Sequence, residues 1–374
     1  MEFYLFITFL IGGFVSWMLI PRIVVISNKK RLFDEPNSRS SHAQPVPRLG
    51  GVSFLPGLAL SVLIVSGLRS LLGHELPDGI ERQVTTESLF FCSGLIVMYL
   101  IGVADDLRGV SFTHKFLYQI FAALLLVLGG VYVDNFHGMF GIYEVPMAVS
   151  IAVTLLLVVF VINAINLIDG VDGLASGLSA VPLFVFGLWF WNAGLYVYSM
   201  IALGMLGTLL PFFIYNVFGR RYKLFMGDTG SLIIGYIIAF LSAKFCMLNV
   251  SPETYQVTGA PVIILSLLFI PLFDACRVFL VRALKGKSPF MPDRNHIHHK
   301  FLDMGFSHRQ TMCSLIASAF LIVGMNFWML PKLGPNLMFL IDILGWGILM
   351  QLLHRVGLRL KHRKSEREAT KCGV

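Results

Sequence analysis

The 374-residue sequence has little charge and few cysteines. Asp, Glu, Lys and Arg make up only 13% of it, whereas a soluble globular domain carries roughly 25% charged residues. Hydrophobic residues make up 56%, so the composition excludes a water-soluble globule and predicts a membrane protein. The five cysteines are odd in number and include no Cys-x-x-Cys pair. We therefore expect small packing residues rather than a disulfide framework.

Long apolar runs provide candidate membrane spans. A spanning helix needs about 20 largely apolar residues. The first run is too long for the core of a signal peptide, and no basic segment precedes it. We expect an all-α polytopic membrane protein with eleven spans. They are Phe3–Ser27, Gly50–Leu68, Ser88–Ala104, His114–Val133, Pro146–Ile168, Ser179–Ala193, Val197–Val217, Ser231–Leu248, Gly259–Val281, Gln310–Leu330 and Leu337–Val356.

The Lys and Arg residues of the loops predict the orientation. Basic residues are enriched in cytoplasmic loops, and here nearly all of them fall in alternate loops and in the C-terminal segment. Only Arg69, Arg82 and Lys332 lie in the opposite loops. This predicts an external N-terminus and a cytoplasmic C-terminus, as an odd number of spans requires. Residues 1–357 would form one integral-membrane domain, and residues 358–374 a basic cytoplasmic tail on the anionic leaflet.

The stretch from Asn163 to Gly173 concentrates polar side chains directly after an apolar run. Asn163, Asn166, Asp169 and Asp172 follow one another at three-residue spacing, which makes them neighbours on a helix. Oxygen ligands at the foot of an apolar helix suit a hard cation such as Mg²⁺. A polar helix cap with Asx turns is the alternative.

Three more carboxylates lie at predicted span ends. Asp105 and Asp106 end the third span, and adjacent acids at a membrane boundary are costly unless they meet a cation or water. Lys115 follows shortly after, so the pair predicts a phosphate and metal site, or else an exposed polar turn. Asp228 begins an apolar helix, where a carboxylate favours the helix N-terminus or binds a metal. Phe225 is placed to stack on a base or simply to pack.

Two further loops carry candidate ligands. Gly50-Gly51 opens the second span and either offers backbone N–H groups to a phosphate or sugar, or is an ordinary connector. The largest cytoplasmic loop contains one arginine and three histidines, a combination that favours pyrophosphate binding. Zinc and a solvated surface are the alternatives. These four residues are Arg294, His296, His298 and His299.

All these groups lie on the predicted cytoplasmic side, while the span centres are nearly free of ionisable residues. A transporter would more often place ionisable groups near the midplane of broken helices. The pattern therefore predicts an interfacial site, open to the cytosol and to lipid headgroups. Asp274 and Arg277 fall outside the pattern, and we expect them to pair with each other.

Together these segments resemble the polyprenyl-phosphate N-acetylhexosamine-1-phosphate transferase family, of glycosyltransferase 4 type, over residues 30–310. Asp105-Asp106 resembles the paired aspartates of the family, and Lys115 stands at the place of its lipid-phosphate lysine. Residues 163–173 resemble its NxxNxxDGxDGL motif, and residues 225–228 its FMGD motif. The His-Ile-His-His sequence is similar to the branch that starts surface polysaccharides with GlcNAc.

The resemblance implies a role for each candidate residue. Asp105, Asp106 and Asp228 would be catalytic, and Asp228 and Asn166 would hold Mg²⁺, which Mn²⁺ could replace. Lys115 and Asn163 would bind the lipid phosphate. Asp106 would position Lys115 or the acceptor, Phe225 would stack on uracil, and Asp172 would face its edge. The nucleotide-sugar ligands would be Gly50, Gly51, Asp169, Asp172, Phe225, Arg294, His296, His298 and His299.

The implied reaction transfers GlcNAc-1-phosphate from UDP-GlcNAc to undecaprenyl phosphate at the cytoplasmic face of the inner membrane. It would initiate a cell-surface polysaccharide such as O-antigen or teichoic acid. The partners would be the two substrates and the bilayer, with no nucleic acid. Three points stay open: whether the protein forms a homodimer, whether the donor is another UDP-N-acetylhexosamine or UDP-MurNAc-pentapeptide, and whether the reaction passes through an aspartyl-phosphate intermediate. So do a transporter and a non-catalytic membrane scaffold.

Overall fold

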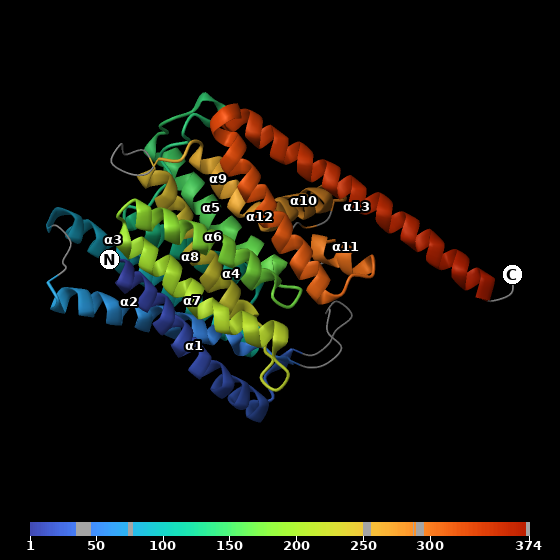
Figure 1. The fold of residues 1–374 in the computed structure, drawn as a ribbon, viewed down its shortest axis with the longest axis horizontal. Helices are drawn as coiled ribbons and strands as arrows, with labels where there is room; N and C mark the ends of the chain where they lie inside the picture. Colours follow the sequence, from blue (N-terminus) through green and yellow to red (C-terminus); the bar gives the residue numbers. More distant parts are fainter. Residues whose placement is uncertain (35–45, 74–77, 250–255, 287, 289–294, 372–374) are drawn as a thin grey trace.

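The computed structural model describes residues 1–34, 46–73, 78–249, 256–286, 288 and 295–371 (Figure 1). The described chain is mainly α-helical, as the sequence predicted. Its α-helices are α1 (Glu2–Lys30), α2 (Phe54–Leu71), α3 (Asp78–Arg108), α4 (Phe112–Leu128), α5 (Met147–Ile168), α6 (Leu174–Asn192), α7 (Tyr196–Phe218), α8 (Gly227–Leu248), α9 (Ala260–Leu267), α10 (Phe269–Leu284), α11 (Ile297–Asp303), α12 (His308–Leu333) and α13 (Pro335–Lys371).

Short elements complete the fold. Two 3₁₀ turns, η1 (Leu49–Ser53) and η2 (Met139–Gly141), precede α2 and α5. The strands β1 (Phe33–Asp34) and β2 (Val46–Pro47) pair antiparallel between α1 and η1. They bring the start of α2 back toward the bundle.

The helices confirm a polytopic membrane protein. Within the described residues, nine helices are long and apolar enough to cross a membrane. The pair α9 and α10 passes the same test together but bends by 82°, and α4 is a shorter apolar helix. These segments occupy the eleven regions in which the sequence predicted spans. The number of crossings and the orientation of the termini stay predictions.

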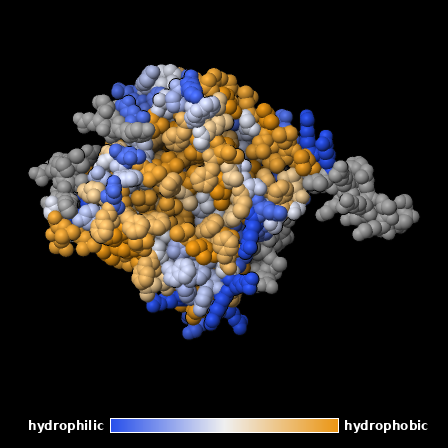
Figure 2. All heavy atoms as spheres, viewed as in Figure 1, coloured by the Kyte–Doolittle hydropathy of each residue, from blue (hydrophilic) through white to orange (hydrophobic). Residues whose placement is uncertain are grey.

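Helix α8 lies at the centre of the bundle, and its residues from Thr229 to Cys246 are all buried. It packs mainly against α3 and α5, while α1, α2 and α7 form an adjoining group (Figure 1). Hydrophobic side chains cover much of the visible face of the bundle in Figure 2, as lipid contact requires. The backbone of α13 continues as one helix through residue 371, so residue 358 does not mark a break in secondary structure.

A close approach between α3 and α8 brings two predicted site segments together. A Cβ added to Gly102 of α3 would lie 2.5 Å from the Cα atom of Thr229 in α8. Only glycine leaves room for the two backbones at this level. The end of α3, with Asp105 and Asp106, is thereby placed against the start of α8.

Four cysteines lie among the described residues, and all four are free thiols: Cys92, Cys246, Cys276 and Cys313. The expectation of packing residues without a disulfide framework is confirmed for these four positions. Cys372 lies outside the described residues.

We expect the loop charges to decide the orientation of the bundle. The prediction places residues 28–48, 218–230 and 282–309 in the cytoplasm, and residues 69–87 and 249–258 outside. A single cysteine at the exposed Ser288, in a cysteine-free background, should react with an impermeant maleimide only after the membrane is opened. A cysteine at the exposed Leu72 is the matched control and should react in intact cells. Labelling of Ser288→Cys from outside would overturn the predicted topology.

Candidate active site

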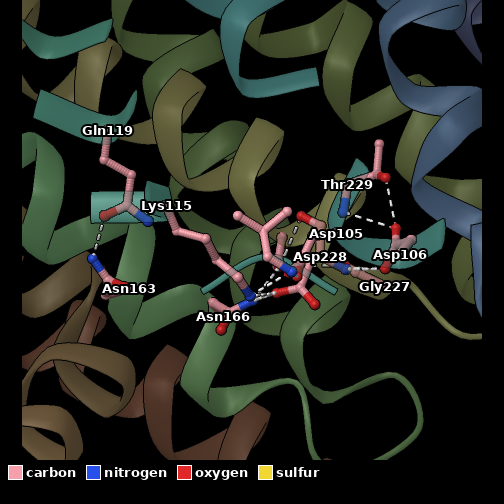
Figure 3. Close-up of polar contacts among 11 residues, drawn as sticks. Asp105, Asp106, Lys115, Gln119, Asn163, Asn166, Gly227, Asp228 and Thr229 are labelled. Carbon is pink, nitrogen blue, oxygen red and sulfur yellow. Dashed lines mark hydrogen bonds and ion pairs between the residues drawn. The ribbon is translucent and has the colours of Figure 1, made fainter. Parts of the chain in front are cut away.

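One lysine links carboxylates from two different helices. Asp105 lies in the last turn of α3, Lys115 in the first turn of α4, and Asp228 at the start of α8. The Lys115 ammonium forms an ion pair with Asp105 Oδ2 and lies 3.2 Å from Asp228 Oδ1 (Figure 3). The side chain of Asp228 is 32% exposed, compared with 5% for Asp105. Asp228 is therefore the carboxylate that is more open to a ligand.

Asn166 completes this arrangement from α5. Its Nδ2 atom donates hydrogen bonds to Asp228 Oδ1 at 2.7 Å and to Ser231 Oγ at 2.8 Å. The two residues predicted to hold Mg²⁺ therefore lie in direct contact, although 62 positions separate them in the chain. Figure 3 shows Lys115, Asn166 and Asp228 meeting at one point.

Asp106 points to the backbone of α8 rather than to Lys115. Asp106 Oδ1 accepts a hydrogen bond from the Asp228 N–H at 2.8 Å, and Oδ2 accepts from the Thr229 N–H at 3.0 Å and its hydroxyl at 2.6 Å. The first N–H groups of a helix have no partner within the helix, and a carboxylate also suits the positive end of its dipole. The sequence assigned Asp106 to Lys115 or the acceptor. In the structure Asp105, not Asp106, pairs with Lys115, while Asp106 holds the backbone of Asp228. A contact of Asp106 with the acceptor stays a prediction.

Gly227 makes that contact sterically feasible. Its φ angle of 71° lies in the left-handed region, and an added Cβ would be 2.7 Å from both Asp106 oxygens. A larger residue would therefore strain the backbone and displace Asp106. The glycine of the FMGD sequence thus has a defined structural function.

Asn163 lies one turn before Asn166 but has a different partner. Its Nδ2 atom donates to Gln119 Oε1 at 2.6 Å and to the carbonyl of Val159 at 2.7 Å. Gln119 lies one turn after Lys115 on α4, so this contact holds the lysine-bearing helix against α5 (Figure 3). Binding of the lipid phosphate by Asn163 stays a prediction.

The turn between α5 and α6 contains the other two acids of the motif. Asp169 follows the last residue of α5. Asp172 Oδ2 accepts a hydrogen bond from Lys223 Nζ at 2.6 Å, and this ion pair joins the turn to the loop before α8. The sequence pattern did not predict this role of Lys223, which lies only two residues before Phe225.

The glycine pair has a structural contact that the sequence did not predict. The Gly50 N–H donates to the Phe225 carbonyl at 2.9 Å, and the Gly51 N–H donates to the Met226 carbonyl at 2.8 Å. The Phe225 N–H in turn donates to the Pro47 carbonyl at 2.7 Å. The predicted role of the glycine amides as phosphate or sugar donors is therefore corrected. They fix the half-buried Phe225 and the segment that leads into α8.

The histidine loop is anchored on Asp274 of α10. The predicted pair with Arg277 is confirmed, since Arg277 Nη2 lies 2.7 Å from Asp274 Oδ1. Asp274 Oδ2 also lies 2.9 Å from His296 Nδ1 and accepts from the Ile297 N–H at 3.1 Å. Asp274 thus orients His296 and the start of α11. Its position in an apolar run was the signal for this role, because a carboxylate inside a span needs partners.

His298 is buried against the turn after α5. A Cβ on Gly170 would collide with its Nε2 atom. Burial, helped by the neighbouring imidazoles of His299 and His296, lowers the pKa of His298 to about 3. The His298 imidazole is therefore neutral at pH 7. It can still form hydrogen bonds. Arg294, the expected cation of this loop, lies outside the described residues.

The donor atoms at Asp228 fit a magnesium ion. In the part of the chain that the structure describes, no group of three His, Cys, Asp or Glu side chains is arranged to hold a metal. Mg²⁺ needs only one or two carboxylates, because waters and substrate phosphates complete its shell. Asp105 and Asp228 already converge on one positive charge, that of Lys115. The carboxylate of the more exposed Asp228 and the amide oxygen of the adjacent Asn166 are suitable oxygen ligands.

The sequence is similar to several known proteins. Residues 88–245 match glycosyl transferase family 4. Over 360 residues, 94% of this chain and 92% of the relative, it is 30% identical to an undecaprenyl-phosphate alpha-N-acetylglucosaminyl 1-phosphate transferase of Yersinia pestis. The protein of that name from Escherichia coli K12 is 30% identical over 80% of this chain and 77% of its own length. A probable undecaprenyl-phosphate N-acetylglucosaminyl 1-phosphate transferase of Bacillus subtilis is 30% identical over 84% and 82%.

Proposed function

The chain belongs to glycosyl transferase family 4, and from this membership we propose that it transfers GlcNAc-1-phosphate from UDP-GlcNAc to undecaprenyl phosphate. The products are undecaprenyl-diphosphate-GlcNAc and UMP. The names of the relatives support both the lipid acceptor and the transferred group. The reaction would take place at the cytoplasmic face of the inner membrane and start a surface polysaccharide.

The convergence of Asp105, Lys115 and Asp228 at the end of three apolar helices is the observation that carries this proposal. A phosphate on a lipid needs a cation at the membrane boundary. A nucleotide sugar needs neutralisation of its pyrophosphate next to that cation. Few other reactions require an anionic lipid and an anionic soluble substrate to meet at one carboxylate-lined point.

The proposed reaction exchanges one phosphoanhydride bond for another. An oxygen of the undecaprenyl phosphate attacks the sugar-bearing phosphorus of UDP-GlcNAc. The bond from that phosphorus to the bridging oxygen breaks, and the electron pair leaves with UMP. Because a similar bond forms and breaks, the step is near thermoneutral. The protein must then supply alignment and charge neutralisation rather than driving force.

In this proposal Lys115 binds the acceptor phosphate, and Asp105 orients Lys115 through their ion pair. The second pKa of a phosphomonoester lies near 6, so the acceptor is largely dianionic at neutral pH. Asp105 would accept the proton of the remaining monoanion, either directly or through Lys115. Asp106 contributes by holding the backbone of Asp228 in place.

We propose that Asp228 and Asn166 hold Mg²⁺, which Mn²⁺ can replace. When bound, the metal neutralises the pyrophosphate charge. Asp172, paired with Lys223, and the half-buried Phe225 are the proposed uracil contacts. Asp169, Arg294 and the three histidines complete the proposed nucleotide-sugar site, with His296 oriented by Asp274.

The test of the function is an assay of UMP release by purified protein in detergent. We expect release only when UDP-GlcNAc, undecaprenyl phosphate and Mg²⁺ are all present. The lipid product should carry radiolabel from the sugar. UMP release without the lipid acceptor, or no release with all three components, would overturn the proposed function.

A competition assay should identify the sugar donor. We expect turnover with UDP-GlcNAc and little or none with UDP-MurNAc-pentapeptide, because the His-Ile-His-His sequence resembles the GlcNAc branch. Each nucleotide sugar would be supplied at equal concentration, and the lipid products separated by chromatography. Other UDP-N-acetylhexosamines would be tested in the same assay, and we expect their turnover to lie between those of the two donors. Efficient use of the pentapeptide donor would assign the chain to a different branch.

A further inference from the structure

A buried ion pair joins α3 and α8 at the end of the bundle opposite the candidate site. Lys244 Nζ lies 2.9 Å from Glu87 Oε2 and 3.1 Å from Glu87 Oε1, and the two side chains are 1% and 2% exposed. The hydroxyl of Tyr198 in α7 donates to Glu87 Oε2 at 2.5 Å. The Lys244 ammonium also lies 5.0 Å from the centre of the Tyr198 ring. None of these residues touches the candidate site.

Stability alone does not explain this pair. Removing two charges from water costs several kcal/mol per ion, and well-packed apolar residues of similar volume are often equally or more stable. The best-attested benefit of such a buried polar group is that it fixes one register between packed helices.

The same two helices carry the candidate site at their other ends. Asp106 of α3 accepts hydrogen bonds from the backbone N–H groups of Asp228 and Thr229 in α8. Sliding α8 by one residue moves each atom about 1.5 Å along the axis and turns it by roughly 100°. Such a shift would break these hydrogen bonds and move the Asp228 carboxylate away from Lys115 and Asn166.

The packing between the two ends is mostly apolar, and its most shape-specific contact is Tyr236 of α8 against Gly94 of α3. The buried residues of α8 between Leu232 and Leu241 are aliphatic or aromatic, apart from Gly235. In lipid, apolar side chains gain little from one partner over another of similar shape. The charged pair has no equivalent one turn away, because Lys244 is the one basic residue of α8 and residues 83–86 and 88–104 of α3 contain no acid.

We propose that the Glu87–Lys244 pair fixes the axial register of α3 against α8 and so positions Asp228 in the site. Glu87 and Lys244 are then positioning residues for the transfer reaction. The effect on turnover rests on the proposed function. The register itself can be measured without any substrate.

The decisive variant removes both charges while keeping similar volumes: Glu87→Gln combined with Lys244→Met. We expect its melting temperature to equal or exceed that of the wild type. We expect kcat to fall about 10- to 100-fold, as a displacement near 1 Å can produce, with a smaller change in KM for UDP-GlcNAc. Hydrogen–deuterium exchange should show faster exchange of the amides of Asp228 and Thr229, which depend on Asp106.

A second buried pair provides the matched control. Asn326 of α12 donates to Asp342 Oδ1 of α13 at 3.1 Å, and neither helix carries a proposed site residue. Asn326→Leu combined with Asp342→Leu should leave kcat and the exchange of the α8 amides unchanged. A charge exchange, Glu87→Lys with Lys244→Glu, should restore amide protection and most of the turnover, because it retains an ion pair.

The outcomes separate the two proposals. A charge-free variant with normal kcat and normal amide protection overturns the positioning role. If the charge-free variant does not fold, the charge-exchanged variant decides. Unprotected Asp228 and Thr229 amides in the folded charge-exchanged protein would overturn the positioning role, and protected amides would support it. If the wild type releases no UMP but the amides respond as expected, the proposed function fails and the register proposal stands.

Discussion

Asp228→Asn is expected to lower turnover at least about 100-fold, a loss of about 3 kcal/mol of transition-state stabilisation. The substitution keeps the shape of the side chain but removes the charge that faces Lys115 at 3.2 Å and Asn166 at 2.7 Å. The backbone N–H of residue 228 still donates to Asp106, so the protein should remain folded. Turnover would be measured as the initial rate of UMP release, and metal binding as Mn²⁺ binding by EPR. We expect the variant to lose both turnover and Mn²⁺ binding.

Asp303→Asn is the matched control for this change. Asp303 is an exposed acid at the end of α11, outside the proposed machinery. It should keep wild-type turnover and Mn²⁺ binding. Near-normal turnover of Asp228→Asn at saturating Mg²⁺ would be incompatible with a metal ligand at this position.

Asp105→Asn is expected to slow turnover by about 100- to 10,000-fold, the range of a general acid–base contribution, while Mn²⁺ and nucleotide-sugar binding persist. An asparagine can still accept the hydrogen bond that Asp105 Oδ1 receives from the Val110 N–H at 2.6 Å. It cannot form the ion pair with Lys115 or take a proton from the acceptor. Turnover and Mn²⁺ affinity should be measured on the same preparations as for Asp228→Asn.

The two variants test the assignment of roles against each other. If Asp105→Asn loses Mn²⁺ while Asp228→Asn remains active, the ligand and the proton acceptor have been exchanged. If both lose Mn²⁺ equally, Asp105 is a metal ligand as well, and its position opposite Asp228 across Lys115 would explain why.

The sequence was sufficient to predict the fold class and the end of the bundle that carries the site. Apolar runs long enough to span lipid can form little else than helices. Each polar motif lies at a boundary of such a run, so alternation along the chain places the motifs at one end. Asn166 and Asp228 were predicted to act together, and the structure brings them into contact.

The sequence was not sufficient to separate the roles of Asp105 and Asp106. Successive residues of a helix point about 100° apart, so one faces Lys115 and the other the start of α8. Which of the two does so depends on how α3 is rotated in the bundle. That rotation is set by contacts such as Gly102 with Thr229, which have no local sequence signal.

Other missed features also depend on distant contacts. The amides of Gly50 and Gly51 look available in the sequence, because their acceptors are carbonyls more than 170 positions away in the chain. The neutral state of His298 follows from burial, which a histidine-rich loop does not reveal. Lys223 was overlooked because its partner Asp172 comes from another segment, and the contact of Asp274 with His296 was missed for the same reason.

The position of Lys244 also has a consequence for biosynthesis. A lysine at the centre of an isolated membrane helix costs roughly 3 kcal/mol to insert, and one near the end of the span, as Lys244 is, costs less. Its partner Glu87 precedes it by 157 residues and is therefore synthesised first. By the time α8 leaves the insertion machinery, α3, α5 and α7 can already stand together with the carboxylate facing inward. When α8 is released into this partly assembled bundle and not into open lipid, the Lys244 ammonium meets Glu87 without first contacting acyl chains.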